Sequence, residues 1–233
     1  MNRAGLYIAL GIGAVVGVVF GVFPQLDLAI SGLFFDPTIH DFRINALTWA
    51  QQSREAARII VALIVAPAFL ALFGKLLLPR RPMFIKTRVA LFLVLTLLIG
   101  PGLITNSLFK EHWGRARPID VTQFGGTDRF TAWWDPRGPC PGNCSFIAGE
   151  PAGAFWTLAP AALTPPQWRA LAYGAALAFG SGVGVLRIAG GGHFFTDVVF
   201  AGVIMYLLIW TAYTALYRWW PERNGKETET PGE

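Results

Sequence analysis

The sequence predicts an all-α integral membrane protein, built as a bundle of six transmembrane helices. Of its 233 residues, 54% are hydrophobic and only 14% are charged, and the mean hydropathy is +0.48. A soluble protein of this size would need more polar surface than this composition supplies. The hydrophobic residues also gather in runs long enough to cross a bilayer, with polar or basic loops between them.

The hydrophobic runs place the spans. The first, at 6–23, could be a signal peptide, but no small-x-small cleavage site follows it, so we expect a retained helix. Residues 24–55 mix apolar and acidic side chains, which is typical of an amphipathic piece lying on the bilayer, with Trp49 at headgroup depth. Residues 1–233 form one domain, and the polar segment 222–233 is expected to be a disordered tail. The other spans are expected at about 57–78, 89–109, 149–163, 170–186 and 193–216.

The basic residues predict the orientation in the membrane. Six spans place both termini on one side, and the positive-inside rule makes the more basic side cytoplasmic. Residues 24–55, 110–144 and 187–193 then lie on the outer side. The net charge of +5 does not indicate nucleic-acid binding, because the basic residues are scattered among apolar spans. Those on the cytoplasmic side are Arg3, Arg80, Arg81, Lys86, Arg88, Arg169, Arg218, Arg223 and Lys226.

The only two cysteines, Cys140 and Cys144, lie in one loop on the predicted outer side. Metal binding through these two thiols would leave a zinc ion short of ligands, because no histidine lies nearby in the sequence. We therefore predict a local disulfide on an oxidising face of the membrane, with two free thiols as the alternative.

The segment from Arg187 to Asp197 contains a candidate nucleophile. If the chain is helical from His193 onward, His193 and Asp197 lie one turn apart on the same face. Asp197 would then accept a hydrogen bond from one imidazole nitrogen and leave the other nitrogen free to attack. The three glycines at 190–192 let the backbone approach a ligand closely, and the planar guanidinium of Arg187 suits a phosphate.

A basic cluster follows the third predicted span. Lys110, Arg115 and Arg117 could simply mark the membrane interface, but cations are under-represented on the outer side. Together with Arg187 they form a group of like charges that needs an anion. Phosphate fits better than carboxylate because its additional oxygens occupy more of the donors. We read His112, within the same segment, as structural rather than as a proton donor.

A third cluster lies at the start of the fourth predicted span. The backbone amides near Gly149 would begin a helix and favour an anion. Glu150 at the bilayer boundary is costly unless it is paired or functional. As a neutral acid it could protonate a leaving alkoxide. The alternative is that Glu150 forms a salt bridge with Arg115 or Lys110.

Two of these clusters resemble the motifs of a known family. Lys110 and Arg117-Pro118 match the Lys-x6-Arg-Pro motif of the type 2 phosphatidic acid phosphatase superfamily, the membrane lipid phosphate phosphatases related to vanadium haloperoxidases. Arg187, His193 and Asp197 match its Arg-x5-His-x3-Asp motif. The resemblance implies that His193 attacks phosphorus to form a phosphohistidine while Asp197 orients the ring. It also implies that the three cations of the motifs hold the phosphoryl oxygens, and that water completes the reaction without a metal or cofactor.

The middle motif departs from the family pattern. Where the family usually has Pro-Ser-Gly-His, this chain has Ile147-Ala148-Gly149-Glu150. Ser145 and the amide of Gly149 are left to contact the phosphate, and Glu150 takes the place of the general-acid histidine. A carboxylic acid can fill that role if burial raises its pKa. The departure suggests a divergent subgroup, such as the lipid A phosphatases of Gram-negative bacteria.

The resemblance therefore implies a phosphatase that hydrolyses a lipid phosphomonoester or diphosphate at the outer, periplasmic face of a bacterial inner membrane. The substrates it suggests are lipid A, phosphatidylglycerophosphate, undecaprenyl diphosphate and phosphatidic acid. One alternative is a phosphotransferase that passes the same phosphoryl group to another lipid. The other is a non-catalytic lipid-binding or anion-transport protein, which would have no need of an oriented nucleophile.

Overall fold

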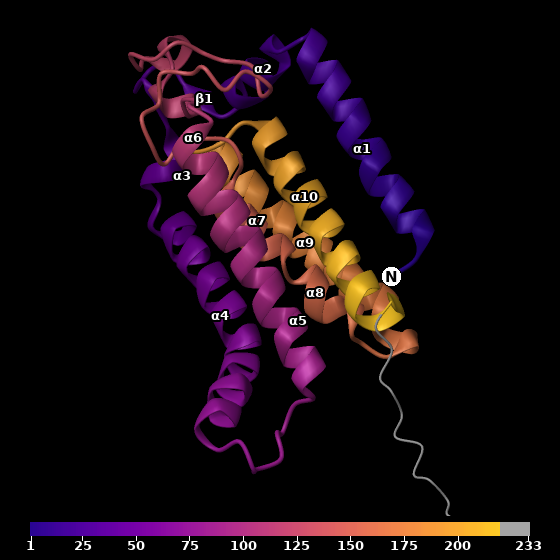
Figure 1. The fold of residues 1–233 in the computed structure, drawn as a ribbon. Coiled ribbons are helices and arrows are strands. Elements are labelled where there is room, and N and C mark those ends of the chain that lie inside the picture. The colour runs from indigo at the N-terminus through magenta and orange to yellow at the C-terminus, as the bar shows by residue number, and fades with distance from the viewer. Residues whose placement is uncertain (220–233) are drawn as a thin grey trace, which may run out of the picture.

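The computed structural model describes residues 1–219 and is a bundle of long helices with loops and short elements gathered at one end (Figure 1). The predicted helical architecture is confirmed, apart from β1 (Phe35–Asp36), which pairs antiparallel with β2 (Asp41–Phe42). The segment 222–233 lies outside the described residues. The helices are α1 (Arg3–Val22), α2 (Gln25–Gly32), α3 (Arg43–Ala46), α4 (Thr48–Leu77), α5 (Thr87–Leu97), the π-helix η1 (Leu98–Phe109), α6 (Lys110–His112), the 3-10 turns η2 (Pro118–Asp120) and η3 (Thr122–Phe124), α7 (Gly149–Phe155), α8 (Leu158–Ala162), α9 (Pro166–Ala189), α10 (Phe195–Thr214) and the π-helix η4 (Ala215–Trp219).

Within residues 1–219, five helical stretches are long and apolar enough to cross a membrane. They are α1, α4, the run from α5 to α6, α9, and the run from α10 to η4. The predicted span at 149–163 forms two short helices instead, α7 and α8. The break has a local cause, because Pro160 has no N–H to donate to the carbonyl of Trp156, which accepts from the amide of Ala159 at 2.8 Å. Figure 1 shows α7 and α8 one after the other along the bundle.

Two predicted helix starts differ from the structure, the first by nine residues and the second by two. The second span was expected to begin at 57, but α4 begins at Thr48, so that Arg54 lies inside the helix. The last span was expected to begin at His193, but α10 begins at Phe195 and His193 lies in the preceding turn. The expected amphipathic piece at 24–55 is divided among α2, the β1–β2 ribbon, α3 and the start of α4.

The core of the bundle surrounds α7 and α8. Ala152, Trp156 and Ala159 are fully buried, and the indole of Trp156 donates to the Thr96 hydroxyl on α5 at 3.0 Å. Glycines on α9 allow this close approach, since a Cβ at Gly180 would lie 2.2 Å from the Phe155 ring. The small residues of α9 therefore let α7 pack closely against it. The first turn of α7 lies at the polar end of the bundle.

The loop between α6 and α7 is packed against the bundle. The indole of Trp133 donates to the carbonyl of Gly17 on α1 at 3.2 Å, and its ring lies 4.4 Å from that of Phe200 on α10. Trp113 in turn donates to the carbonyl of Trp133 at 2.7 Å. Gly114 has a positive φ of 73°, and a Cβ there would lie 2.8 Å from the carbonyl oxygen of Gly138. These contacts give the loop a defined position beside α6.

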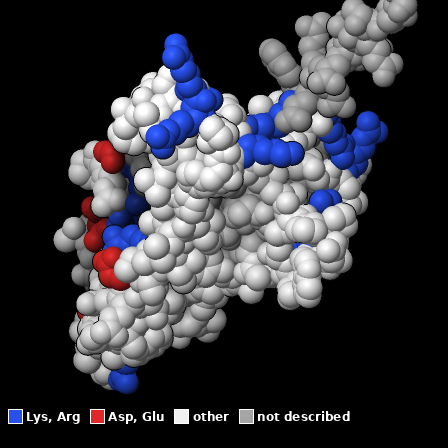
Figure 2. All heavy atoms as spheres, turned by 90° about the horizontal axis from the view of Figure 1, so that it is seen from below, with Lys and Arg blue, Asp and Glu red and all other residues white. Residues whose placement is uncertain are grey.

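The two ends of the bundle differ in charge. In Figure 1 the α4–α5 connection, the start of α9 and the N-terminus lie at the lower end, whereas α2, α6 and the α6–α7 loop lie at the upper end. Seen from below, many lysine and arginine side chains lie across the upper part of the view, while aspartate and glutamate gather at the left edge, where other basic side chains lie beside them (Figure 2). The basic residues Arg80, Arg81 and Lys86 belong to the α4–α5 connection.

Candidate active site

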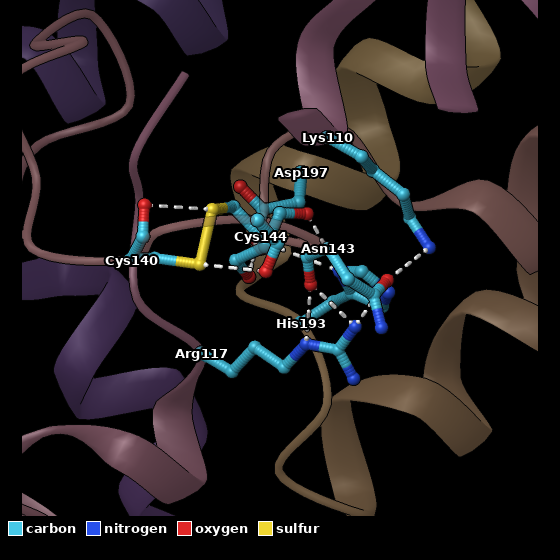
Figure 3. Close-up of a disulfide and its surroundings, with 9 residues drawn as sticks. Lys110, Arg117, Cys140, Asn143, Cys144, His193 and Asp197 are labelled. Atoms are coloured by element: carbon cyan, nitrogen blue, oxygen red, sulfur yellow. Dashed lines mark hydrogen bonds and ion pairs between the residues drawn. A yellow bond between two sulfur atoms is a disulfide. The ribbon is translucent and has the colours of Figure 1, made fainter. Parts of the chain in front are cut away.

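Three segments far apart in the sequence meet at the upper end of the bundle. Lys110 lies in α6, Gly149 begins α7, and Arg187 lies in the last turn of α9. His193 lies in the turn that enters α10, and Arg117 reaches the same region from the α6–α7 loop (Figure 3). The structure thus brings the sequence-predicted residues together at one site.

The imidazole of His193 has a defined tautomer. The residue is only 1% exposed, and Nδ1 lies 2.7 Å from the backbone carbonyl oxygen of Ser145. Because a carbonyl oxygen only accepts hydrogen bonds, Nδ1 carries the hydrogen and Nε2 carries the lone pair. Nε2 has no hydrogen-bond partner within residues 1–219, so it is the nitrogen available for nucleophilic attack.

Activity should persist below the ordinary pKa of a histidine. Burial, followed by the charges of three neighbouring cations, lowers the pKa of His193 well below 6.5. The nucleophile is the neutral imidazole, so we expect kcat/KM to stay level as the pH falls through 6.5 and to decline only at lower pH. The same lowered pKa affects the folding stability. As the pH falls below about 6.5, the unfolded chain binds this proton before the folded protein does, so the folded protein becomes less stable. A pH profile of kcat/KM with an acid midpoint at 6.5 or above would contradict this expectation.

Asp197 does not contact His193 in the way the spacing predicted. Its Oδ2 lies 3.9 Å from Nδ1 of His193 and accepts from the hydroxyl of Ser145 and from the amide of Phe194 at 2.8 Å. The reason is that His193 precedes α10, so the two residues are not one helical turn apart. Asp197 instead closes the first turn of α10 and holds Ser145, whose carbonyl orients His193. Ser145 was expected to reach the phosphate, but its hydroxyl is committed to Asp197.

Arg115 was grouped with the phosphate-binding cations, but it lies behind the site. Its side chain is fully buried and pairs with Asp197 and with Asp27 of α2, the latter at 2.8 Å. It also donates to the carbonyl of Thr131 at 3.0 Å and stacks on the Phe194 ring at 4.3 Å. The hydrogen bonds and ion pairs of Arg115 therefore join α2, the α6–α7 loop and α10.

Lys110 and Arg117 converge on Asn143. The Lys110 ammonium donates to the Asn143 side-chain oxygen at 3.2 Å, and Arg117 donates to the same oxygen at 2.9 Å. A Cβ at Gly149 would lie 3.1 Å from the Lys110 nitrogen, so a side chain there would crowd the ammonium group. The amide end of α7 and the two cations accordingly face the same small region.

Arg187 has a donor nitrogen that forms no hydrogen bond with the described residues. Its side chain is 7% exposed, and its Nε is buried without a hydrogen-bond partner among the described residues. Glu150 lies 3.7 Å from that nitrogen, too far for a hydrogen bond. A buried guanidinium with free donors is suited to bind an anion such as phosphate.

Glu150 is held as a carboxylate. Arg54 of α4 donates to both of its oxygens, at 2.9 and 2.7 Å, which is the bidentate geometry of a charged pair. The predicted salt-bridge partners were Arg115 and Lys110, and this was wrong because the early start of α4 brings Arg54 to the site instead. The contact also leaves the neutral general-acid role of Glu150 without structural support, since both oxygens already accept from a guanidinium.

Glu150 and Arg54 should behave as one unit. We expect Glu150→Gln and Arg54→Met each to lower kcat/KM about ten-fold, because Arg187 loses its oriented counter-charge. The double variant should lose no more than the worse single variant. Phosphate release from a lipid substrate measures all three. A general-acid role would instead make Glu150→Gln cost roughly 10²-fold or more, whatever residue stands at position 54.

Cys140 and Cys144 form a disulfide with a Cα–Cα distance of 5.7 Å, at the edge of the site (Figure 3). Within residues 1–219, no three His, Cys, Asp or Glu side chains are grouped so that they could hold a metal ion. The disulfide closes a short loop that carries Asn143 toward Lys110 and Arg117.

Three residues of this site were not predicted from the sequence. Arg54 had a usable signal, because an arginine on the predicted outer side departs from the positive-inside pattern. Asp27 also had one, since an acid among the apolar residues of 24–34 needs a partner. Asn143 had no signal beyond its place beside the cysteines, because its role depends on the path of the loop.

The comparisons with known proteins agree with the site geometry. The PAP2 superfamily profile matches residues 88–221. The chain is 34% identical to the lipid A 4′-phosphatase of Francisella tularensis subsp. novicida, over 94% of this chain and 98% of that protein. It is 38% identical to the lipid A 4′-phosphatase of Rhizobium leguminosarum, over 56% of this chain and 54% of that protein. No solved structure matches the chain significantly.

The profile match covers all three segments of the site, from Lys110 to Asp197, and the first relative aligns along nearly the whole chain. The residues that meet at the upper end of the bundle are those that the two motifs of the family contain. The chain therefore belongs to the PAP2 superfamily and is a membrane lipid phosphatase.

Proposed function

We propose that this phosphatase hydrolyses a phosphate monoester of lipid A or of a similar phosphorylated glycolipid, through a phosphohistidine intermediate at His193. The observation that carries the proposal is the pairing of two features. A buried imidazole presents its free Nε2, and the buried Nε of Arg187 donates a hydrogen bond to no described residue. A nucleophile beside free anion donors is what attack on a phosphate requires.

The reaction would proceed in two displacements. Nε2 of His193 forms a bond to phosphorus while the bond from phosphorus to the lipid oxygen breaks, and that oxygen takes up a proton from solvent water. Water then attacks the phosphorus and gives one proton to the solvent, the P–N bond breaks, and inorganic phosphate leaves with the neutral imidazole restored. Arg187, Lys110 and Arg117 stabilise the equatorial oxygens in both steps.

The substrate assignment rests on the relatives. Proteins named lipid A 4′-phosphatase match this chain at 34% identity over nearly its full length and at 38% over about half. The altered middle segment, in which Glu150 pairs with Arg54, supports a subgroup that departs from the usual family pattern. Phosphatidic acid, phosphatidylglycerophosphate and undecaprenyl diphosphate are the competing substrates.

The site would face the periplasm of a bacterial inner membrane, with both termini in the cytoplasm. The basic α4–α5 connection lies at one end of the bundle, and the α6–α7 loop, which contains the disulfide, lies at the other end (Figure 1). A basic end favours the cytoplasm, and a disulfide favours the oxidising side. Counting α7 and α8 as one crossing brings the number of spans to six, which agrees with termini on the same side.

The test is phosphate release by the purified protein from each of the four lipids, in the presence of EDTA. We expect lipid A to be the best substrate, to lose the mass of one phosphate, and to leave an acid-labile phosphoprotein when the reaction is quenched. Release from another lipid alone would refute the substrate assignment. Appearance of the phosphate on a lipid hydroxyl would replace hydrolysis by phosphoryl transfer.

A further inference from the structure

Asn143 makes more contacts with the phosphate-site cations than any motif residue does. Its backbone carbonyl accepts from Nε and Nη2 of Arg117, at 3.2 and 2.7 Å. Its side-chain oxygen accepts from the same Nη2 at 2.9 Å and from the Lys110 ammonium at 3.2 Å. One residue thus joins the two cations of the first motif, as Figure 3 shows.

The donors that remain free are the ones that a phosphate would need. A lysine ammonium has three N–H donors and an arginine guanidinium has five. Asn143 takes one from Lys110 and engages only the Nε and Nη2 side of Arg117. Within residues 1–219, the Nη1 side of Arg117 and the other ammonium hydrogens of Lys110 form no hydrogen bond, which leaves them for an anion. Two cations this close repel each other, and an acceptor that hydrogen-bonds to both offsets part of this repulsion.

The backbone around Asn143 is built to hold this position. The amides of Cys140 and Cys144 donate to the carbonyls of Gly114 and Lys110, at 3.0 and 2.9 Å. The loop between these bonds is closed by the disulfide. Asn143 has a positive φ of 50°, a conformation that asparagine tolerates better than most residues.

We propose that Asn143 is a positioning residue of the phosphate site. It is the shared acceptor that keeps Lys110 and Arg117 side by side, with their remaining donors turned toward the bound phosphate. The proposal rests on the proposed function only in taking phosphate as the anion of this site. It assigns a specific role to the disulfide-closed loop, which lies outside both motifs.

The experiment measures the affinity of the purified full-length protein for inorganic phosphate by calorimetry. Asn143→Gly removes the shared side-chain acceptor and keeps a residue that accepts the positive φ, and we expect it to weaken phosphate binding about ten-fold. In an Arg117→Met background the same change should have a much smaller effect, because Asn143 acts through the cation. Thr127→Gly, at an exposed position of the same α6–α7 loop, is the matched control and should leave binding unchanged.

Asn143→Asp is the second variant, in case the glycine loosens the loop. It has the same shape but places a negative charge between the two cations, so it should weaken phosphate binding more than ten-fold while the thermal midpoint does not fall. The proposal is overturned if Asn143→Gly binds phosphate as tightly as the wild type or more tightly. It is also overturned if Asn143→Asp binds normally, if the effect of glycine persists in full without Arg117, or if the wild type binds no phosphate.

The two proposals fail in different ways. If the wild type binds phosphate, Asn143→Gly weakens that binding, and no lipid releases phosphate, then the proposed function is wrong and the role of Asn143 stands. If lipid A is hydrolysed and Asn143→Gly changes neither phosphate binding nor KM, then the role of Asn143 is wrong and the function stands.

Discussion

His193→Ala is expected to lower phosphate release from the lipid substrate by about 10⁴-fold or more, because it removes the nucleophile and leaves no replacement. The hydroxyl of Ser145, the residue whose carbonyl contacts His193, donates to Asp197 and is not free to attack. The measurement is a single-turnover assay of phosphate release. Quenched samples of the variant should contain no acid-labile phosphoprotein.

Two controls separate chemistry from folding. His112→Ala removes a histidine of α6 that is exposed and lies 3.0 Å from the carbonyl of Leu108, and we expect it to retain near-normal turnover. The His193→Ala protein should still bind inorganic phosphate, because Arg187, Lys110 and Arg117 remain. Turnover within ten-fold of the wild type in His193→Ala would refute the phosphohistidine mechanism.

The fold was predictable wherever hydrophobicity and length decide the outcome. Five of the predicted spans correspond to long apolar helices, because an apolar run of that length has one stable arrangement in a bilayer. The span at 149–163 was expected as one helix, although Pro160 carries a local signal for the break between α7 and α8, because it has no N–H to donate to the carbonyl of Trp156. The early start of α4 was missed because its first turns, around Arg54, are polar and are held by tertiary contacts with Glu150.

The residues of the two motifs could be predicted from the sequence as members of the site. Spacing identified Lys110, Arg117, Arg187 and His193, which the structure brings together. Spacing did not reveal their partners, because hydrogen bonds such as that from His193 to the Ser145 carbonyl depend on where a turn ends and a helix begins. Glu150 shows the same limit: its position beside a phosphate site suggested acid chemistry, and only the structure places a guanidinium on both of its oxygens.

The second large effect is expected on stability. Arg115→Met should destabilise the protein by about 3–5 kcal/mol, because it leaves two buried carboxylates, Asp27 and Asp197, without their counter-charge. The measurement is the thermal midpoint and the fraction of folded protein in detergent. Arg137→Met, which breaks the exposed pair with Asp135, is the control and should leave the midpoint almost unchanged.

A double variant distinguishes a structural ion pair from a phosphate-binding cation. Arg115→Met with Asp27→Asn removes one of the orphaned charges, so it should recover part of the stability lost by Arg115→Met alone. If Arg115 belonged to the phosphate site, Asp27→Asn would restore nothing, and the refolded double variant would bind inorganic phosphate poorly. We expect the opposite, because Asp197 still accepts from Ser145 and Phe194, and the cations that face the phosphate are untouched. The arginine inside the first motif would then serve the catalytic histidine only by holding α2 and α10 in place behind it.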